Sequence, residues 1–268
     1  MKNKKIAVLM GGPSTECEVS LKTGKAIVSA LHAKGYNAIP IELEPARLIE
    51  QLKAEKIDVV FNAIHGRFGE DGVLQGVLTM LGIPFTGSGV LASAVAMDKA
   101  ISKQIFKAAH IPTPRAIYYQ DTDNTKAVIA DIKRQFVFPL VIKASGQGSS
   151  IGVYIVQRET DVESSLAEAF KLSDRVIVEE FIDGRELTVA HLGNDTMTVL
   201  PIIEIVPRTG RYDYQAKYTK GYTNYLVPAQ LDSITTLLVE RTATAAAAAL
   251  RCRGIARVDM MLDKHGTV

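Results

Sequence analysis

The first 85 residues alternate short apolar runs with amphipathic stretches, and this alternation constrains the fold more than any other feature of the chain. The short runs suit buried strands, while the stretches between them have the spacing of helices that bury one face. These segments are Ile6 to Met10, Val19 to Leu31, Ala38 to Ile41, Leu48 to Leu52, Val59 to Ala63 and Val73 to Leu81. Strands that alternate with helices form βαβ units on a parallel sheet, so we expect an N-terminal α/β domain.

The pattern changes further along the chain. Two helical runs separated at Ala96-Met97-Asp98 lead into a mixture of strands and helices. After Gly184, the expected strands Glu186 to Leu192 and Met197 to Val206 follow each other without helices, which is typical of antiparallel α+β structure. The tyrosine-rich segment 208–225 has no clear period, and long loops of this kind in compact domains are usually lids or binding loops. We therefore expect three parts, at residues 1–95, 96–183 and 184–268.

Composition excludes several classes of protein. The 31 Lys and Arg against 29 Asp and Glu give a formal charge of +2, which is too balanced for a chain that wraps nucleic acid or an anionic membrane. No window approaches the roughly 18 apolar residues of a membrane span. The two cysteines, Cys17 and Cys252, are too few for a disulfide framework and suggest free thiols in a reducing compartment. We expect a cytoplasmic protein with no nucleic-acid or membrane partner.

Glycine-rich segments are candidates for phosphate contacts, although the P-loop pattern is absent. Gly87 to Ala92 matches a dinucleotide fingerprint in letters, but the acidic residue expected about 20 positions later is missing, so a helix start is the better interpretation. Lys143 to Gly152 combines three glycines with three serines between two expected strands. Their N–H groups and hydroxyls can surround phosphate oxygens beside the Lys143 charge. A glycine-rich hairpin without a ligand is the alternative.

Two later segments add weight to a nucleotide site. Glu179 to Ile182 closes one strand and Glu186 begins the next, which suits an adenine edge, an apolar wall and a carboxylate for ribose hydroxyls. In the expected strand Ile255 to Leu262, the period of two puts Arg257 and Asp259 on one face. An exposed Arg–Asp pair is the plain interpretation. The functional one is a hard-metal ligand beside a group that stabilises an oxyanion.

Six motifs in order now give the whole chain a specific resemblance. They are Gly11 to Ser20, His65 to Gly72, Gly87 to Gly89 with Met97 to Lys99, Lys143 to Gly152, Tyr212 to Tyr218, and Arg257 to Asp259. In these motifs the chain resembles the D-alanine-D-alanine ligases of the ATP-grasp superfamily. The resemblance implies a Rossmann-like pre-ATP-grasp domain for substrate, followed by an ATP-grasp fold of two subdomains, with the tyrosine-rich segment as a closing lid.

The resemblance also assigns ATP-binding residues. They would be Lys99, Lys143, Ser149, Ser150, Glu179, Phe181, Ile182, Glu186 and Lys217. The lysines and the serine loop would contact the phosphates. Glu179 and the backbone near Phe181 and Ile182 would hold adenine, and Glu186 would hold the ribose.

The remaining implied roles concern the substrates. Glu16 would bind the ammonium of the first D-alanine and join Ser149 and Tyr218 in a hydrogen-bonded network, with His65 near the substrates. ATP would phosphorylate the first D-alanine, and the amine of the second would attack the acyl phosphate while Arg257 stabilises the oxyanion. Asp259 would bind one of two Mg²⁺ or Mn²⁺ ions. The product would serve peptidoglycan synthesis, and the protein would be a homodimer.

The C-terminal residues depart from the family pattern. Asp263 to Gly266 predicts a hairpin turn, after which Thr267-Val268 begin a partner strand. In the family, that strand carries the Glu-x-Asn metal ligands and is followed by a segment that binds the second substrate. The resemblance therefore implies a C-terminally truncated chain that binds nucleotide weakly and turns over only with the strand restored.

Other functions stay open from the sequence. The chain could be an ATP-grasp ligase for a different carboxylate, or a D-alanine-D-lactate ligase, although the resemblance links Tyr218 to dipeptide formation. A nucleotide-binding module without catalysis is the alternative from another class. A dehydrogenase would require NAD binding, which we do not expect.

Overall fold

A computed structural model describes residues 1–148, 151–208, 216, 219 and 221–268 of the chain. The chain forms two compact units. Unit 1 comprises Met1–Val95 with Arg251–Ile255, and unit 2 comprises Ala96–Leu250 with Ala256–Val268. Each unit has its own β-structure and its own clusters of buried apolar residues.

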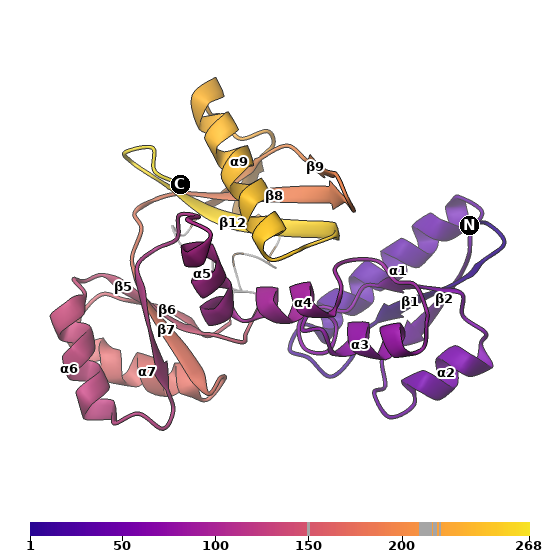
Figure 1. Cartoon of the computed structure of the whole chain (residues 1–268), viewed down its shortest axis with the longest axis horizontal. Coiled ribbons are helices and arrows are strands. Elements are labelled where there is room, and N and C mark those ends of the chain that lie inside the picture. The colour runs from indigo at the N-terminus through magenta and orange to yellow at the C-terminus, as the bar shows by residue number, and fades with distance from the viewer. Residues whose placement is uncertain (149–150, 209–215, 217–218, 220) are drawn as a thin grey trace. The chain divides into compact units, whose positions relative to one another are not determined.

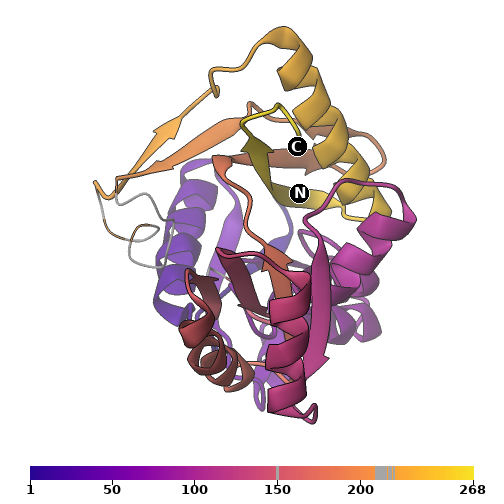
Figure 2. The same ribbon diagram turned by 90° about the vertical axis from the view of Figure 1, so that its left-hand side faces the viewer.

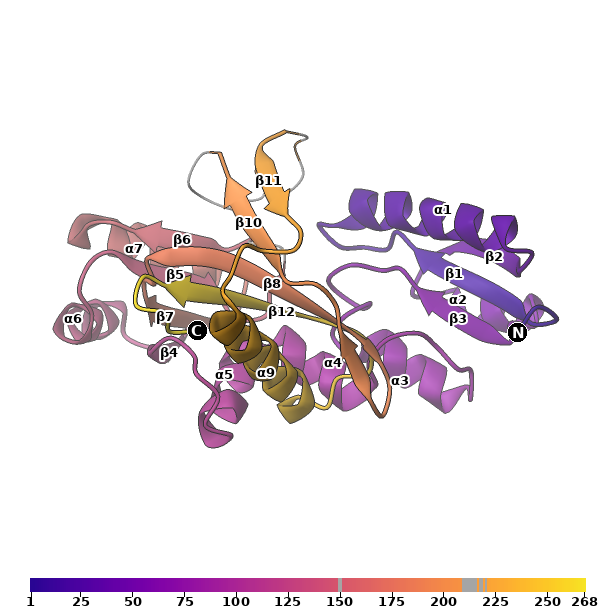
Figure 3. The same cartoon turned by 90° about the horizontal axis from the view of Figure 1, so that it is seen from above.

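Unit 1 is built on a parallel sheet with the strand order β2-β1-β3 (Figure 3), and Figure 1 labels its strands β1 and β2. The central strand, β1 (Lys5–Met10), pairs with β2 (Asn37–Glu42) on one side and with β3 (Val59–Asn62) on the other. All of β1 except Lys5 is buried. A central strand without a solvent-facing side is expected where helices cover both faces of a parallel sheet.

Helices cover both faces of the unit 1 sheet (Figure 3). On one face, α1 (Cys17–Ala33) packs against the cluster that contains Ile6, Val8 and Met10. On the other, α2 (Leu48–Ala54) and α3 (Val73–Met80) pack against Ala7 and Leu9. The side chains of β1 divide between the two clusters because successive residues of a strand point to opposite faces. A glycine at position 24 lets α1 approach closely, since a Cβ there would lie 2.5 Å from the Cβ of Met10.

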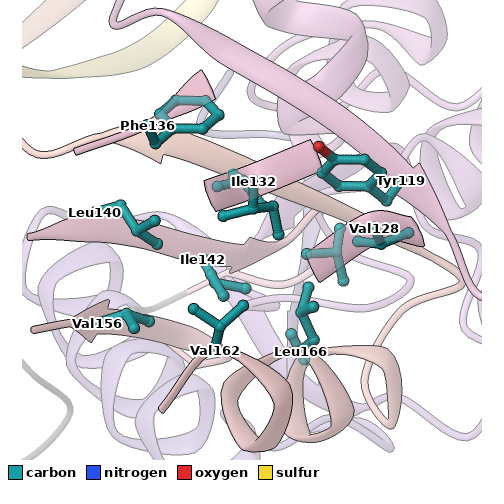
Figure 4. Packing of buried hydrophobic residues seen from close by; sticks show 12 residues of the cluster. Tyr119, Val128, Ile132, Phe136, Leu140, Ile142, Val156, Val162 and Leu166 are labelled. Atoms are coloured by element: carbon teal, nitrogen blue, oxygen red, sulfur yellow. The ribbon is translucent and has the colours of Figure 1, made fainter. Parts of the chain in front are cut away.

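Unit 2 contains an antiparallel sheet of four strands in the order β4-β7-β5-β6. The strands are β4 (Ala116–Gln120), β5 (Leu140–Ala144), β6 (Val153–Val156) and β7 (Arg175–Glu180). Its apolar face is covered by α6 (Thr125–Gln135) and by α7 (Val162–Phe170), which follows a short 3-10 helix, η1 (Glu159–Asp161). Figure 4 shows Ile132 of α6 and Leu166 of α7 packing with Ile142 of the sheet. This core fixes β5 and β7, the strands that carry Lys143 and Glu179.

The second sheet of unit 2 has the order β11-β10-β8-β12, and β9 pairs with β8. Its strands are β8 (Gly184–Gly193), β9 (Met197–Val199), β10 (Ile203–Pro207), β11 (Thr223–Leu226) and β12 (Gly254–Asp263). Helix α9 (Ser233–Ala249), gold in Figure 2, packs on β8 and β12 through Val239 and Ala243. The remaining helices are α4 (Val90–Met97) and α5 (Lys99–Ala108).

The architecture confirms the predicted fold class, with a parallel α/β region first and antiparallel sheets after it. The strand predicted at Met197 to Val206 is wrong in extent, because it forms two strands, β9 and β10, separated at Leu200 to Ile202. Pro201 lies in the gap, and a proline has no N–H to donate to a strand ladder. The proposed part boundaries at residues 96 and 184 stay predictions.

Two expectations from composition concern the state of the cysteines and the absence of membrane-spanning segments. Cys17 and Cys252 are both free thiols, as expected. In the ranges that the structure covers, no helix combines the length and the apolar character that crossing a bilayer requires.

Candidate functional site

Glu16 occupies a corner of unit 1 beyond the carboxyl ends of the parallel strands, where ligands bind in open α/β sheets. It is buried, and its backbone N–H donates to the Ser14 hydroxyl at 3.2 Å. The same hydroxyl donates to the carbonyl oxygen of His65 at 2.9 Å, joining the loop after β1 to the loop after β3. Gly66, at φ 71°, makes room for the carboxylate, since a Cβ there would lie 3.1 Å from Oε2 of Glu16. The two predicted substrate residues of unit 1, Glu16 and His65, thus lie together.

In unit 2, the start of α5 is fastened to the end of β5. The Asp98 carboxylate caps the helix by accepting from the N–H groups of Ala100 at 2.9 Å and Ile101 at 3.1 Å. It also accepts from the Ser145 hydroxyl at 2.5 Å. The Lys99 ammonium donates to the carbonyl oxygens of Ala144 and Gln147. The cap therefore places Lys99 beside the entrance to the glycine-rich segment.

Glu179 of β7 is the centre of a buried charge cluster. Only 4% of the residue is exposed. Its Oε2 lies 2.5 Å from Nζ of Lys143 on β5, and its Oε1 lies 2.9 Å from Nζ of Lys103 on α5. Lys103 also donates to the Thr113 hydroxyl at 2.6 Å. Because Val141 is the register partner of Glu179, Lys143 lies two residues along on the same face of the sheet, within reach of the carboxylate.

Burial and charge shift the pKa values in this cluster. Burial, and then repulsion by Lys143, lower the pKa of Lys99 to about 8. Burial also lowers the pKa of Lys103. Burial alone would raise the pKa of Glu179, but attraction to Lys143 and Lys103 outweighs it and holds the pKa below its ordinary value. Glu179 is therefore ionised. Lys143 and Lys103 contact its carboxylate and Lys99 lies near Lys143, so three lysines gather around one buried carboxylate, which favours a bound polyanion.

The adenine and ribose candidates follow directly in the chain. Phe181 and Ile182 are half-buried in the connection from β7 to β8. Glu186, near the start of β8, is the register partner of Ile205 on β10. One continuous segment thus carries Glu179 and these three residues.

Arg257 and Asp259 form a close pair on β12. Nε of Arg257 donates to Oδ1 of Asp259 at 2.9 Å, and Nη2 donates to Oδ2 at 2.8 Å. The Thr188 hydroxyl of the neighbouring strand β8 donates to the same Oδ1 at 2.7 Å. A bidentate pair fixes the plane of the guanidinium as well as its distance. Both side chains are about half exposed, so both can also meet a ligand.

Asp259 is a fitting single ligand for magnesium. Mg²⁺ prefers oxygen donors, and protein sites often use one or two carboxylates together with substrate phosphates. Across the part of the chain that the structure describes, no three His, Cys, Asp or Glu side chains gather as a metal-binding group. Asp259 therefore fits a shared ion, held partly by nucleotide phosphates, better than a closed protein site.

The structure brings together Lys99, Lys143 and Glu179 in unit 2, and Glu16 with His65 in unit 1. The candidates Ser149, Ser150, Lys217 and Tyr218 lie outside the described residues. Sequence reasoning missed Lys103 and Thr188. The only sequence feature that pointed to Lys103 is its spacing of four from Lys99, which puts both lysines on one helix face.

Comparisons with protein families give consistent matches. The family model described as D-ala D-ala ligase C-terminus matches residues 105–268, and the D-ala D-ala ligase N-terminus model matches residues 44–88. A D-alanine--D-alanine ligase of Pelotomaculum thermopropionicum is 45% identical over 266 residues, which cover 98% of this chain and 83% of that protein. One of Desulforudis audaxviator is 47% identical over 265 residues, with 97% and 84% covered.

The chain is also similar to solved structures of ligases. The D-alanine--D-alanine ligase from Bacillus anthracis, complexed with ATP, has a TM-score of 0.82 and 35% identity, covering 97% of this chain and 82% of that one. The VanG D-Ala:D-Ser ligase from Enterococcus faecalis also has a TM-score of 0.82, with 31% identity and coverage of 98% and 88%.

Proposed function

This chain belongs to the D-alanine-D-alanine ligase family, and we propose how its residues carry out the family's reaction. The activity is the ATP-dependent ligation of two D-alanines to D-alanyl-D-alanine, a step of peptidoglycan synthesis. The observation that carries the residue assignment is the buried cluster of Lys99, Lys143 and Glu179 next to a glycine-rich segment. Such a cluster is suited to hold the phosphates of ATP.

In this proposal, positively charged side chains bind the phosphates of ATP. Lys99 and Lys143 meet the phosphates, and the segment from Glu179 through Glu186 takes the nucleoside. Positive groups around the transferring phosphoryl group are the main catalytic device in phosphoryl transfer, because they stabilise charge spread over its oxygens. Ser149, Ser150 and Lys217 are proposed to complete the phosphate contacts. Mg²⁺, held in part by Asp259, would neutralise further phosphate charge.

The first D-alanine is bound by its ammonium group at Glu16. A buried carboxylate attracts a cation strongly, because little water competes for it. His65 lies in the same corner, and we propose that it borders the substrate. The carboxylate of this D-alanine receives the γ-phosphoryl group, which gives an acyl phosphate and ADP.

The amine of the second D-alanine then attacks the acyl carbon. The tetrahedral oxyanion that forms is stabilised by Arg257, whose guanidinium is oriented by Asp259. One such donor contributes about 3 to 4 kcal/mol in comparable oxyanion sites. Phosphate leaves as the peptide bond forms. Tyr218, with Ser149 and Glu16, is proposed to set the choice of an amine acceptor.

We propose further that the protein is a cytoplasmic homodimer. The two free cysteines suit a reducing compartment. The dimer is an expectation from the family resemblance, and light scattering of the purified protein at micromolar concentration measures it directly.

Product analysis tests the proposed acceptor. The protein is incubated with ATP, Mg²⁺ and D-alanine, together with an equal concentration of D-serine or D-lactate, and products are separated by mass. We expect D-alanyl-D-alanine as the main product in both mixtures. A predominance of D-alanyl-D-serine would favour the activity named for the VanG relative, and a predominance of the D-lactate ester would contradict the role given to Tyr218.

A further inference from the structure

Glu179 is held by two lysines that differ sharply in exposure. The side chain of Lys103 is 8% exposed, and that of Lys143 is 28% exposed. Each lysine contacts a different oxygen of the Glu179 carboxylate, so both lysines can bind it at the same time. Lys143 is the lysine that a ligand can reach, whereas Lys103 is enclosed.

Lys103 is fixed on two sides. Its ammonium group lies 2.9 Å from Oε1 of Glu179 and donates to Oγ1 of Thr113 at 2.6 Å. Helix α5, which carries it, is itself fastened to the end of β5 through Asp98 and Ser145. An ammonium group anchored in this way cannot follow a ligand without breaking buried contacts.

Binding of a phosphate by Lys143 creates an electrostatic problem for Glu179. When Lys143 turns to the phosphate, the buried carboxylate loses its 2.5 Å partner. A buried charge that loses its partner is strongly destabilised, because the low-dielectric surroundings do not replace the lost attraction. Without a second cation beside it, the carboxylate would then take up a proton or move, and the segment that follows β7 would lose its anchor.

We propose that Lys103 is a positioning residue for ATP binding, which keeps the Glu179 carboxylate charged and in place while Lys143 exchanges it for a phosphate oxygen. Lys103 does not contact the nucleotide. It acts through Glu179, and the inference rests on the proposed function in that Lys143 must be a phosphate ligand.

The test measures ATP affinity by calorimetry and steady-state kinetics for Lys103→Met, Lys103→Arg and Lys107→Met. Lys107 is exposed on the same helix and controls for loss of a lysine from α5. We expect Lys103→Met to raise the Kd and the KM for ATP at least roughly tenfold with a smaller change in kcat, and Lys103→Arg to recover most of the affinity. Lys107→Met should match the wild type. An unchanged Kd in Lys103→Met, or no recovery in Lys103→Arg, would overturn the inference.

A second pair of variants keeps the test decisive if Lys103→Met does not fold. Thr113→Val removes only the hydroxyl contact of Lys103 and should weaken ATP binding by a smaller factor. In the Glu179→Gln background there is no charge left to hold, so adding Lys103→Met should change the Kd by less than about threefold. A full effect in that background would show that Lys103 acts otherwise. A wild-type protein that binds no ATP would contradict the proposed function itself, whereas normal wild-type binding with unchanged variants contradicts this inference alone.

Discussion

At the residue scale, the phosphate contact proposed for Lys99 would link the charge of this lysine to the affinity for ATP. Its pKa falls to about 8 because burial and the neighbouring Lys143 both disfavour the ammonium form. A bound phosphate reverses the second effect, since an anion nearby favours the charged lysine. Affinity for ATP and the protonation of Lys99 are therefore coupled.

The coupling gives a pH prediction. Between pH 7 and pH 9 the protonated fraction of Lys99 in the free protein falls from most of the molecules to few of them, so ATP affinity should fall roughly tenfold across this range. Near pH 8, ATP binding should be accompanied by proton uptake. Calorimetry in two buffers of different ionisation enthalpy measures both quantities. Lys99→Arg, which does not titrate, should bind with a flat pH profile. A wild-type profile as flat as that of the variant would rule out the coupling.

Glu16 gives the sharpest prediction for the first substrate. Glu16→Gln keeps the size of the side chain but removes the charge that meets the D-alanine ammonium, so kcat/KM for D-alanine should fall by at least roughly a hundredfold. The control is Glu18→Gln, because Glu18 is exposed two residues later at the start of α1. Near-normal turnover of Glu16→Gln with an unchanged melting temperature would show that the assigned role is wrong.

At the element scale, the sequence predicted elements that have a clear period of their own, and it missed those that depend on pairing with another segment of the chain. The N-terminal alternation predicted β1 to α3 because each element buries a face with a simple period. Strand β11 has only one buried residue in four, and pairing with β10 holds it, so its own sequence carries little signal. The split of Met197 to Val206 depended on Pro201, a breaker that the apolar pattern concealed.

The same limit applies to the site. The motifs identified Lys99, Lys143 and Glu179 separately, but the ion pairs of Glu179 join β5, β7 and α5, which only the folded chain brings together. Its spacing puts Lys103 on the same helix face as Lys99, but Lys107 has the same spacing from Lys103, so the sequence did not show which of these lysines is buried. Burial, rather than residue type, distinguishes it from Lys107.

A matched pair of helix caps tests whether α5 positions the phosphate site. Asp98 caps α5 by accepting from the N–H groups of Ala100 and Ile101, and Asn124 caps α6 by accepting from the N–H of Ala127. Loss of the Asn124 cap should cost about 1 kcal/mol of stability, and Asp98→Ala should cost more because it also removes the hydrogen bond from the buried Ser145 hydroxyl. Only Asp98→Ala should also weaken ATP binding, because only that cap holds Lys99 beside β5. Equal ATP affinity in Asp98→Ala and Asn124→Ala would contradict this function of the cap.

Helix α9 and strand β8 enclose a histidine that makes stability depend on pH. His191 is fully buried, and its Nε2 lies 3.2 Å from Oγ1 of Thr244. The Thr244 hydroxyl donates to the Glu240 carbonyl oxygen, so its oxygen accepts from Nε2–H of His191. Burial lowers the pKa of His191 below its ordinary value.

The sign of the effect follows from proton binding. Below about pH 6.5 the unfolded chain binds more protons at this position than the folded chain, so the free energy of unfolding should fall as the pH decreases. Urea unfolding at pH 7.5, 6.5 and 5.5 measures this loss. His191→Gln should lose less stability over that range than the wild type, and His265→Gln, which alters an exposed histidine, should lose as much as the wild type. Parallel curves for the wild type and His191→Gln would show that another group is responsible.

At the scale of the whole molecule, the parallel and the antiparallel sheets carry different groups of the proposed site residues. The parallel sheet of unit 1 gathers Glu16 and His65 at the carboxyl ends of its strands, and the antiparallel sheets of unit 2 carry the lysine cluster and the Arg257–Asp259 pair. The family matches extend over both regions. The sequence predicted this order of parts from its motifs, whereas the homodimer and the metal ions stay predictions.

The most direct test of the central claim is phosphate release from Mg-ATP by the full-length protein, measured with D-alanine, with L-alanine and with no amino acid. The ligase reaction releases phosphate only after an acyl phosphate has formed on the correct substrate, so D-alanine should stimulate release strongly and L-alanine should leave it at the background rate. Stimulation by both enantiomers to the same extent, or release that does not depend on D-alanine, would contradict the account.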